Sequence, residues 1–121
     1  MIERDFPCTP DGIVGAQSFL EEVCVSPKPA VILDEVASNI VRCSGATGFT
    51  LGLENSDAGL QMVFLDDGRA FDPLTETETP DITAAIADRK IGGLGIFMVR
   101  KMSKSVEYRR EGNKNILSVV I

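Results

Sequence analysis

The sequence contains no histidine and no tryptophan, and its 121 residues include a single tyrosine and three cysteines. Without histidine, the chain cannot build an imidazole zinc site, a serine–histidine or cysteine–histidine nucleophile pair, or a phosphohistidine of its own. The cysteines (Cys8, Cys24 and Cys43) are odd in number and form no C-x-x-C pair, so we expect no disulfide framework and a reduced, cytoplasmic setting. Chemistry here must rely on carboxylates, amides and backbone N–H groups, with or without a bound metal ion.

Long apolar runs and basic clusters are missing as well. No stretch approaches the roughly 20 apolar residues that span a membrane, and the N-terminal MIERDFPCTPDG lacks the basic and apolar regions of an export signal. The formal net charge is -6 and no basic stripe is visible, so we expect no direct contact with nucleic acid and no membrane association. The length and the 44% hydrophobic content predict one domain over residues 1–121.

Hydrophobic periodicity predicts an α+β chain, with helices laid on one face of a mixed, mostly antiparallel sheet. The stretch LQMVFLD is apolar on both faces apart from Gln61, which is typical of a central strand. Residues 67–92 carry little periodicity beyond a weak helical patch over 82–90, and a loop of this length is usually functional or mobile. The predicted helices cover about 10–24, about 29–44 and the stretch opened by the glycines at 92–95; the predicted strands cover 2–7, 49–55, 60–66, 105–110 and 116–121.

One candidate site lies on the second predicted helix, in DEVASNIVRC. Glu35 and Asn39 are four residues apart and therefore share a helix face, away from the apolar stripe of Leu33, Val36 and Ile40. A carboxylate and an amide in this arrangement can hold a hydrated Mg²⁺ together with a water or a hydroxyl, and the carboxylate can act as ligand or base. The alternative is an ordinary solvated helix face.

A second candidate is DDGRAFDP, at the end of the predicted central strand. Asp66 can present a carboxylate to a cleft there and accept a hydrogen bond from an exocyclic amine. Gly68 lets the backbone turn and a flat ligand approach. The alternative is a turn made by Asp-Gly chemistry.

The third candidate is IGGLGIFMVRKM, in which Gly92, Gly93 and Gly95 precede apolar residues at helical spacing. No Gly-Lys-Ser/Thr follows, so the stretch is not a P-loop, and its spacing does not match the dinucleotide-binding fingerprint. Backbone N–H groups crowded at a helix start favour phosphate oxygens. The alternative is a glycine-rich hinge.

In this order the three motifs resemble the N, G1 and G2 boxes of the histidine-kinase-like ATP-binding fold (the GHKL superfamily). GGLGIFMVRKM followed by VEYRR is most similar to the anti-sigma-factor serine/threonine kinase branch. The resemblance covers nearly the whole chain, and it implies a two-layer α/β sandwich, the Bergerat fold, that binds ATP with Mg²⁺. Two positions depart from the family pattern, Cys43 where a histidine is often found and Ala70 in place of a second G1 glycine. Both bear on turnover more than on nucleotide binding.

The resemblance also implies roles for single residues. Glu35 would be the catalytic carboxylate that polarises the attacking hydroxyl or water, Asn39 would coordinate Mg²⁺, and Asp66 would bind the adenine amino group. The other implied nucleotide contacts are Gly68 and Ala70 around the adenine, and Gly92, Gly93, Leu94 and Gly95 along the phosphates.

Residues 74–91 would form the ATP lid, with Arg89 and Lys90 at its end within reach of the phosphates. The resemblance further implies transfer of the γ-phosphoryl group to a serine or threonine of a small antagonist domain, sequestration of a sigma factor, and a homodimer. Three other interpretations stay open: the detached catalytic domain of a split sensor histidine kinase, a non-catalytic module in which nucleotide controls partner binding, and an α+β scaffold without a nucleotide site.

Overall fold

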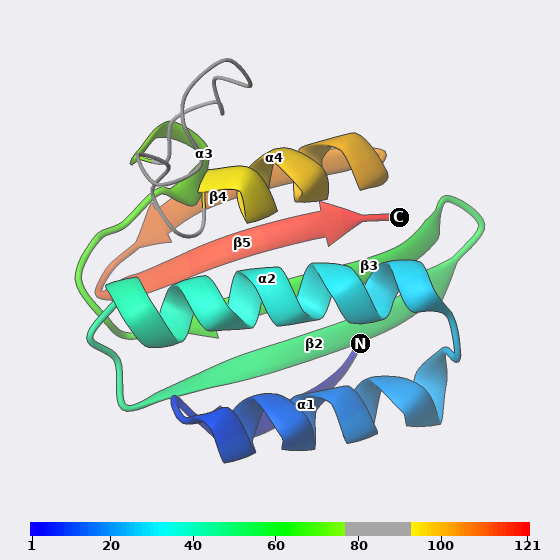
Figure 1. Cartoon of the computed structure of the whole chain (residues 1–121), viewed down its shortest axis with the longest axis horizontal. Helices are drawn as coiled ribbons and strands as arrows, with labels where there is room; N and C mark the ends of the chain where they lie inside the picture. Colours follow the sequence, from blue (N-terminus) through cyan, green and yellow to red (C-terminus); the bar gives the residue numbers. More distant parts are fainter. Residues whose placement is uncertain (77–92) are drawn as a thin grey trace.

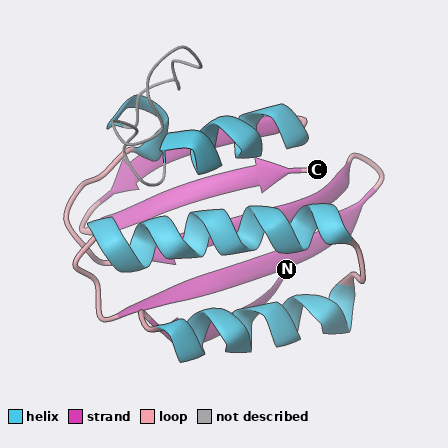
Figure 2. Cartoon of the chain, in the orientation of Figure 1, coloured by secondary structure: helices cyan, strands magenta, loops and turns pink. Residues whose placement is uncertain are grey.

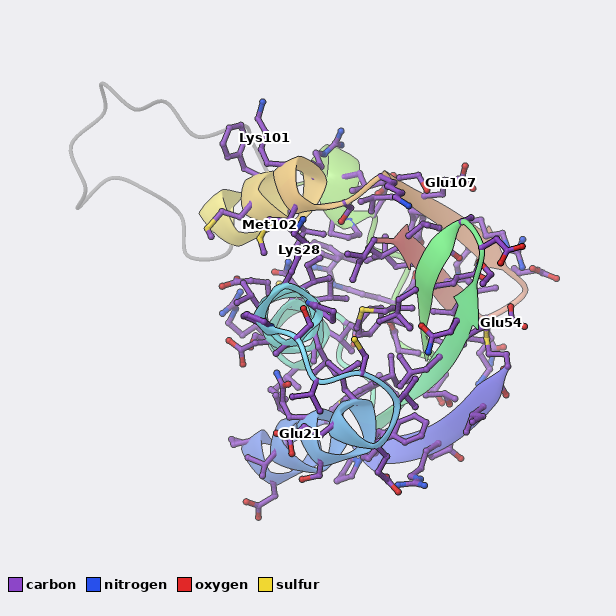
Figure 3. The ribbon with its side chains drawn as sticks, turned by 90° about the vertical axis from the view of Figure 1, so that its right-hand side faces the viewer. Glu21, Lys28, Glu54, Lys101, Met102 and Glu107 are labelled. Atoms are coloured by element: carbon purple, nitrogen blue, oxygen red, sulfur yellow. The ribbon has the colours of Figure 1, made fainter. Side chains whose placement is uncertain are left out.

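The computed structural model describes residues 1–76 and 93–121. These residues form two layers, a sheet and a set of helices packed against one of its faces (Figures 1 and 2). In the view turned by 90°, helices lie on one side, strands on the other, and side chains fill the space between them (Figure 3). The predicted α+β class and helices on one face are confirmed. In chain order the elements are β1 (Ile2–Pro7), α1 (Pro10–Val23), α2 (Pro27–Cys43), β2 (Gly48–Ser56), β3 (Gly59–Asp66), α3 (Pro73–Glu76), α4 (Gly93–Met102), β4 (Ser105–Glu111) and β5 (Lys114–Val120).

The sheet has the strand order β1-β2-β3-β5-β4, and every pairing among the described strands is antiparallel. The expectation of a mixed sheet is wrong in this detail, because strands that run in the same direction, such as β3 and β4, are separated by one that runs the opposite way. β3 lies in the middle, as its apolar residues on both faces predict. The insertion of β5 beside β3 places Asn115 opposite Asp66.

The two long N-terminal helices begin at prolines. α1 starts at Pro10, and Thr9 Oγ1 accepts a hydrogen bond from Gly12 N at 3.1 Å, as an N-cap residue does. α2 starts at Pro27, earlier than predicted, because the extended Ser26 followed by proline suits the first helical turn. None of the helices in the described ranges combines the length and apolar composition needed to cross a membrane.

The short helix α3 is not predicted from the sequence. Its start is stabilised by Asp72, whose Oδ1 accepts a hydrogen bond from Leu74 N at 2.9 Å. An aspartate followed by a proline is a recognisable helix-start signal, which the polar composition around it obscures. The rest of the predicted lid and the weak helical patch over 82–90 lie outside the described residues.

The hydrophobic core lies between the sheet and the helices. Burial alternates along β3, so every second side chain faces the helices. The inward row is Leu60, Met62, Phe64 and Asp66, and the first three of these are packed in the core. The last inward position of the central strand is therefore a carboxylate rather than an apolar group.

Candidate functional site

Several element ends meet at one end of the molecule. The C-terminal ends of α2 and β3 and the N-terminal ends of α4 and β5 lie at the left of Figure 1. The polar side chains that are buried in the described part of the chain gather here, and they are Asn39, Ser44, Asp66 and Asn115. Buried polar groups cost free energy unless they have partners, so their concentration in one place indicates a site.

A small cavity of about 20 Å³, partly open to solvent, lies between these ends. Asn39, Asp66 and Ile96 are in its wall, so the three motifs found in the sequence meet at one cavity. A mostly apolar cavity with a few convergent polar groups is the usual form of a small-molecule site. The other lining residues are Val36, Ile40, Ser44, Phe64, Phe71, Pro73, Asn115 and Leu117.

Asp66 is held at the end of β3 by two hydrogen bonds to the same carboxylate oxygen. Its Oδ1 accepts from Gly68 N and from Asn115 Nδ2, both at 2.9 Å. The second oxygen, Oδ2, has no hydrogen-bond partner within residues 1–76 and 93–121. Oδ2 is not among the fully buried unpaired atoms of the described chain, so it keeps some access to solvent, and a donor group of a ligand can reach it.

Asn39 is 4% exposed and its amide nitrogen is unpaired. In the described ranges, Nδ2 of Asn39 is the one buried side-chain nitrogen or oxygen atom without a hydrogen-bond partner. Its Oδ1 accepts a hydrogen bond from Arg42 Nη2 at 3.2 Å. A ligand acceptor in the cavity would satisfy Nδ2, and the amide oxygen, once released by Arg42, suits Mg²⁺.

A metal ion at this place would depend on Asn39 and on oxygens of the ligand. The described part of the chain holds no group of three or more histidine, cysteine, aspartate or glutamate side chains placed to bind a metal ion. Mg²⁺ commonly binds through one or two protein oxygens together with substrate phosphates and water. The donor set therefore fits a magnesium ion that arrives with a phosphorylated ligand.

Glu35 lies against the first turn of α4. A Cβ atom added to Gly95 would lie 1.9 Å from Glu35 Oε2 and 2.7 Å from its Cδ, far inside contact distance. Glycine at this position therefore leaves the space that the carboxylate occupies. The N-terminal end of a helix carries partial positive charge, which favours a carboxylate there.

Gly68 packs the loop after β3 onto the end of α2. A Cβ atom on Gly68 would lie 2.2 Å from Ser44 O, and the neighbouring Arg69 N donates a hydrogen bond to that oxygen at 2.8 Å. Ala70 is exposed and is not in the cavity wall. No non-glycine residue of the described chain has a positive φ, so alanine is unstrained at position 70.

The remaining predicted residues are placed only in part. Gly93 begins α4, and Leu94 follows it in the first turn. Cys43 ends α2 and is half-buried. Gly92, Arg89, Lys90 and most of the predicted lid lie outside the described residues.

The surroundings of the Cys8 thiol at this end of the sheet raise its pKa. Burial, and then the carboxylates of Asp66 and Asp67, raise the pKa of Cys8 above its usual value. The thiol therefore stays protonated through the neutral pH range. Only the smaller part of the rise, which comes from Asp66 and Asp67, reflects negative charge next to the end of β3.

Two residues at this end of the molecule, Arg42 and Asn115, are not among those predicted from the sequence. Arg42 has a signal, because it follows Asn39 by three positions on the same helix. Asn115 has only a weak one, a polar residue at the head of an apolar strand. The pairing of β5 with β3 brings it to Asp66, and local sequence patterns do not reveal that pairing.

Comparisons with known proteins bear on the fold and the family of this chain. A family model described as a histidine kinase-like ATPase domain matches residues 11–121. The solved structure of the Acinetobacter baumannii histidine kinase AdeS is similar, with a TM-score of 0.57, 14% identity, and coverage of 100% of this chain and 67% of that chain. At this identity the likeness shows the fold alone. A search of curated proteins gives no match. Since the family model spans nearly the entire chain, the protein belongs to the histidine kinase-like ATPase domain family.

Proposed function

We propose that this chain binds ATP with Mg²⁺ in the cavity between α2, β3, α4 and β5 and transfers the γ-phosphoryl group to a serine or threonine of a small antagonist protein. Residues 1–121 would act as one nucleotide-binding unit. The observation that carries the proposal is a pair of polar atoms on residues lining one cavity that have no hydrogen-bond partner in the described part of the chain, the donor Asn39 Nδ2 and the acceptor Asp66 Oδ2. An adenine nucleotide offers its amino group as a donor to Asp66 Oδ2 and acceptor atoms to Asn39 Nδ2.

In this proposal each residue acts from the position already described. Asp66 Oδ2 accepts a hydrogen bond from the adenine amino group, and Asn39 supplies a donor and, when Arg42 moves away, a magnesium ligand. Mg²⁺, when bound, neutralises negative charge on the phosphates. The N–H groups at the start of α4 hold the phosphate oxygens.

Glu35 is the proposed base. Its carboxylate accepts the proton of the attacking hydroxyl, whose oxygen bonds to the γ-phosphorus while the bond to the β–γ bridging oxygen breaks. Contact with α4 holds this carboxylate beside the helix start that receives the phosphates. Positioning of this kind supplies most of the catalysis in phosphoryl transfer.

The protein partners belong to the same proposal. GGLGIFMVRKM followed by VEYRR resembles the anti-sigma-factor kinases, and this resemblance supports a small antagonist domain as phosphate acceptor, a sigma factor as the sequestered protein, and a homodimer. The proposal also includes the cytoplasmic setting expected from the odd number of cysteines.

Thermal unfolding with ATP and Mg²⁺ tests the nucleotide site. Ligand at 100 times its dissociation constant stabilises a protein by about 2.7 kcal/mol, which raises the melting temperature of a domain of this size by on the order of 10 °C. Asp66→Asn should remove most of this rise, whereas Asn55→Ala, at an exposed asparagine of β2, should leave it unchanged. Wild-type protein that shows no rise at millimolar ATP would overturn the proposal.

Incubation with labelled ATP and a candidate antagonist protein encoded beside this gene tests the reaction. Acid-stable label on a serine or threonine of the partner is expected, and Glu35→Gln should abolish transfer while ATP still raises the melting temperature. Acid-labile label on a histidine of the partner would instead identify the chain as the catalytic domain of a split sensor kinase.

A second candidate function, a module that binds nucleotide without transferring phosphate, is favoured by one observation. The proposed magnesium ligand, Asn39 Oδ1, accepts a hydrogen bond from Arg42, which competes with a metal ion for that oxygen. Nucleotide binding that is independent of Mg²⁺, with capture of the partner unchanged in Glu35→Gln and no labelled product, would favour this module over the kinase.

A further inference from the structure

We infer that Asn115 is the positioning residue of the purine pocket and that, through Asp66, it makes the pocket select a purine carrying an amino group over one carrying a carbonyl at the same ring position. The inference rests on the proposed nucleotide site and deepens it. Asn115 and Asp66 are opposite each other on β5 and β3, each 5% exposed, and both line the cavity.

The orientation of the Asn115 amide is fixed by hydrogen bonds on both of its polar atoms. Nδ2 donates to two acceptors, Asp66 Oδ1 at 2.9 Å and Arg69 O at 2.8 Å. A flipped amide would turn its oxygen towards two acceptors and its nitrogen towards donors, so only one orientation satisfies all the groups. The donors to Asn115 Oδ1 are Tyr108 OH at 2.5 Å, Arg110 Nη1 at 3.1 Å and Phe71 N at 3.3 Å.

This fixed amide decides which oxygen Asp66 offers to a ligand. Oδ1 of Asp66 is occupied by Asn115 and by Gly68 N, and Oδ2 is left without a partner in the part of the chain that the structure describes. Both hydrogens of Asn115 Nδ2 are used, and its oxygen already accepts from several donors. At this place in the cavity the side chains of Asp66 and Asn115 therefore present a single free acceptor, Asp66 Oδ2, and no free donor.

A single acceptor discriminates between purines. The amino group of adenine can donate to it, whereas guanine places a carbonyl oxygen at the same ring position. Two acceptors would then face each other inside the cavity, and a site built to hydrogen-bond one group strongly rejects an analogue that lacks it. If Asn115 no longer held Oδ1, the carboxylate would be free to turn, and this selectivity would fall.

The test is the ratio of affinities for ATP–Mg²⁺ and GTP–Mg²⁺, measured by isothermal titration on the full chain. We expect the wild type to prefer ATP by on the order of a hundredfold, and Asn115→Ala to lower that preference at least about tenfold through weaker ATP binding. Tyr108→Phe removes one donor to Asn115 and should lower it by roughly twofold to fivefold. Asn113→Ala, at an exposed asparagine in the adjoining turn, should leave it unchanged.

A purely structural role for Asn115 would weaken ATP and GTP equally, and an unchanged ratio in Asn115→Ala overturns the inference while the nucleotide site stands. If Asn115→Ala does not fold, Tyr108→Phe decides, and a ratio equal to that of the wild type overturns the inference. Wild-type protein that binds neither nucleotide overturns the proposed function, and the inference falls with it.

Discussion

Replacing Gly95 with alanine should separate the stability of the fold from its chemistry. The new Cβ atom would lie 1.9 Å from Glu35 Oε2, whereas non-bonded heavy atoms prefer a separation of roughly 3.5 Å. The carboxylate must therefore retreat by about 1.5 Å. It can do so by rotating its side chain, because the atoms in the way belong to a half-buried glutamate rather than to the backbone.

The two consequences of Gly95→Ala differ in size. Alanine in place of glycine in a helix stabilises it by up to about 1 kcal/mol, which offsets the cost of moving the glutamate, so the melting temperature should stay within about 4 °C of the wild type. Displacement of a catalytic group by about 1 Å costs roughly a hundredfold in rate. We therefore expect turnover to fall about a hundredfold while ATP affinity changes little.

The assay is urea unfolding beside phosphate transfer from labelled ATP. Gly112→Ala is the matched control: position 112 has a φ of 61° with nothing within 4 Å of an added Cβ atom, so it should lose about 1 kcal/mol of stability and keep its turnover. Full turnover in Gly95→Ala would refute the reasoning that contact with α4 positions Glu35. A loss of several kcal/mol would refute the claim that the glutamate can move.

Other predictions concern the surroundings of the site. Gly68→Ala puts a Cβ atom 2.2 Å from the backbone oxygen of Ser44, which cannot rotate away, so urea unfolding should show a loss of about 2–3 kcal/mol; a neutral result would contradict the packing described. Thr9→Ala removes the α1 cap and should cost about 1 kcal/mol in the same assay. The pKa of Cys8 in the folded state lies above its usual 9.0, so the folded state binds the proton more tightly than the unfolded state. The free energy of unfolding should therefore decline as the pH rises from 9.0 through the folded pKa. Asp67→Asn should reduce that decline, and an identical pH profile would argue against the assigned cause.

Local patterns identify most of the elements and the three motifs that meet at the cavity. The spacing of Glu35 and Asn39 places them on one helix face, and the apolar residues of LQMVFLD place β3 in the centre of the sheet. The burial of Asn39 is not predicted, because its face of α2 is polar in sequence and is covered only when β3, β5 and α4 assemble around it.

The missed features depend on contacts between distant parts of the chain. The role of Asn115 requires β5 to lie between β3 and β4, and periodicity carries no information on strand order. The early start of α2 has a different cause, since the prolines of SPKPA act both as a helix break and as a first-turn signal, and only packing decides between them.

The pairing of Asp66 with Asn115 bridges 49 positions of sequence. Closing a loop of that length costs about 3.4 kcal/mol of chain entropy plus a constant, so β3 should join β5 after the neighbouring hairpins have formed. The cavity is then missing from partly folded chains, and nucleotide would recognise only the completed sheet. Bound ligand would lengthen the lifetime of the native state by slowing its unfolding, with little effect on how quickly the chain reaches it.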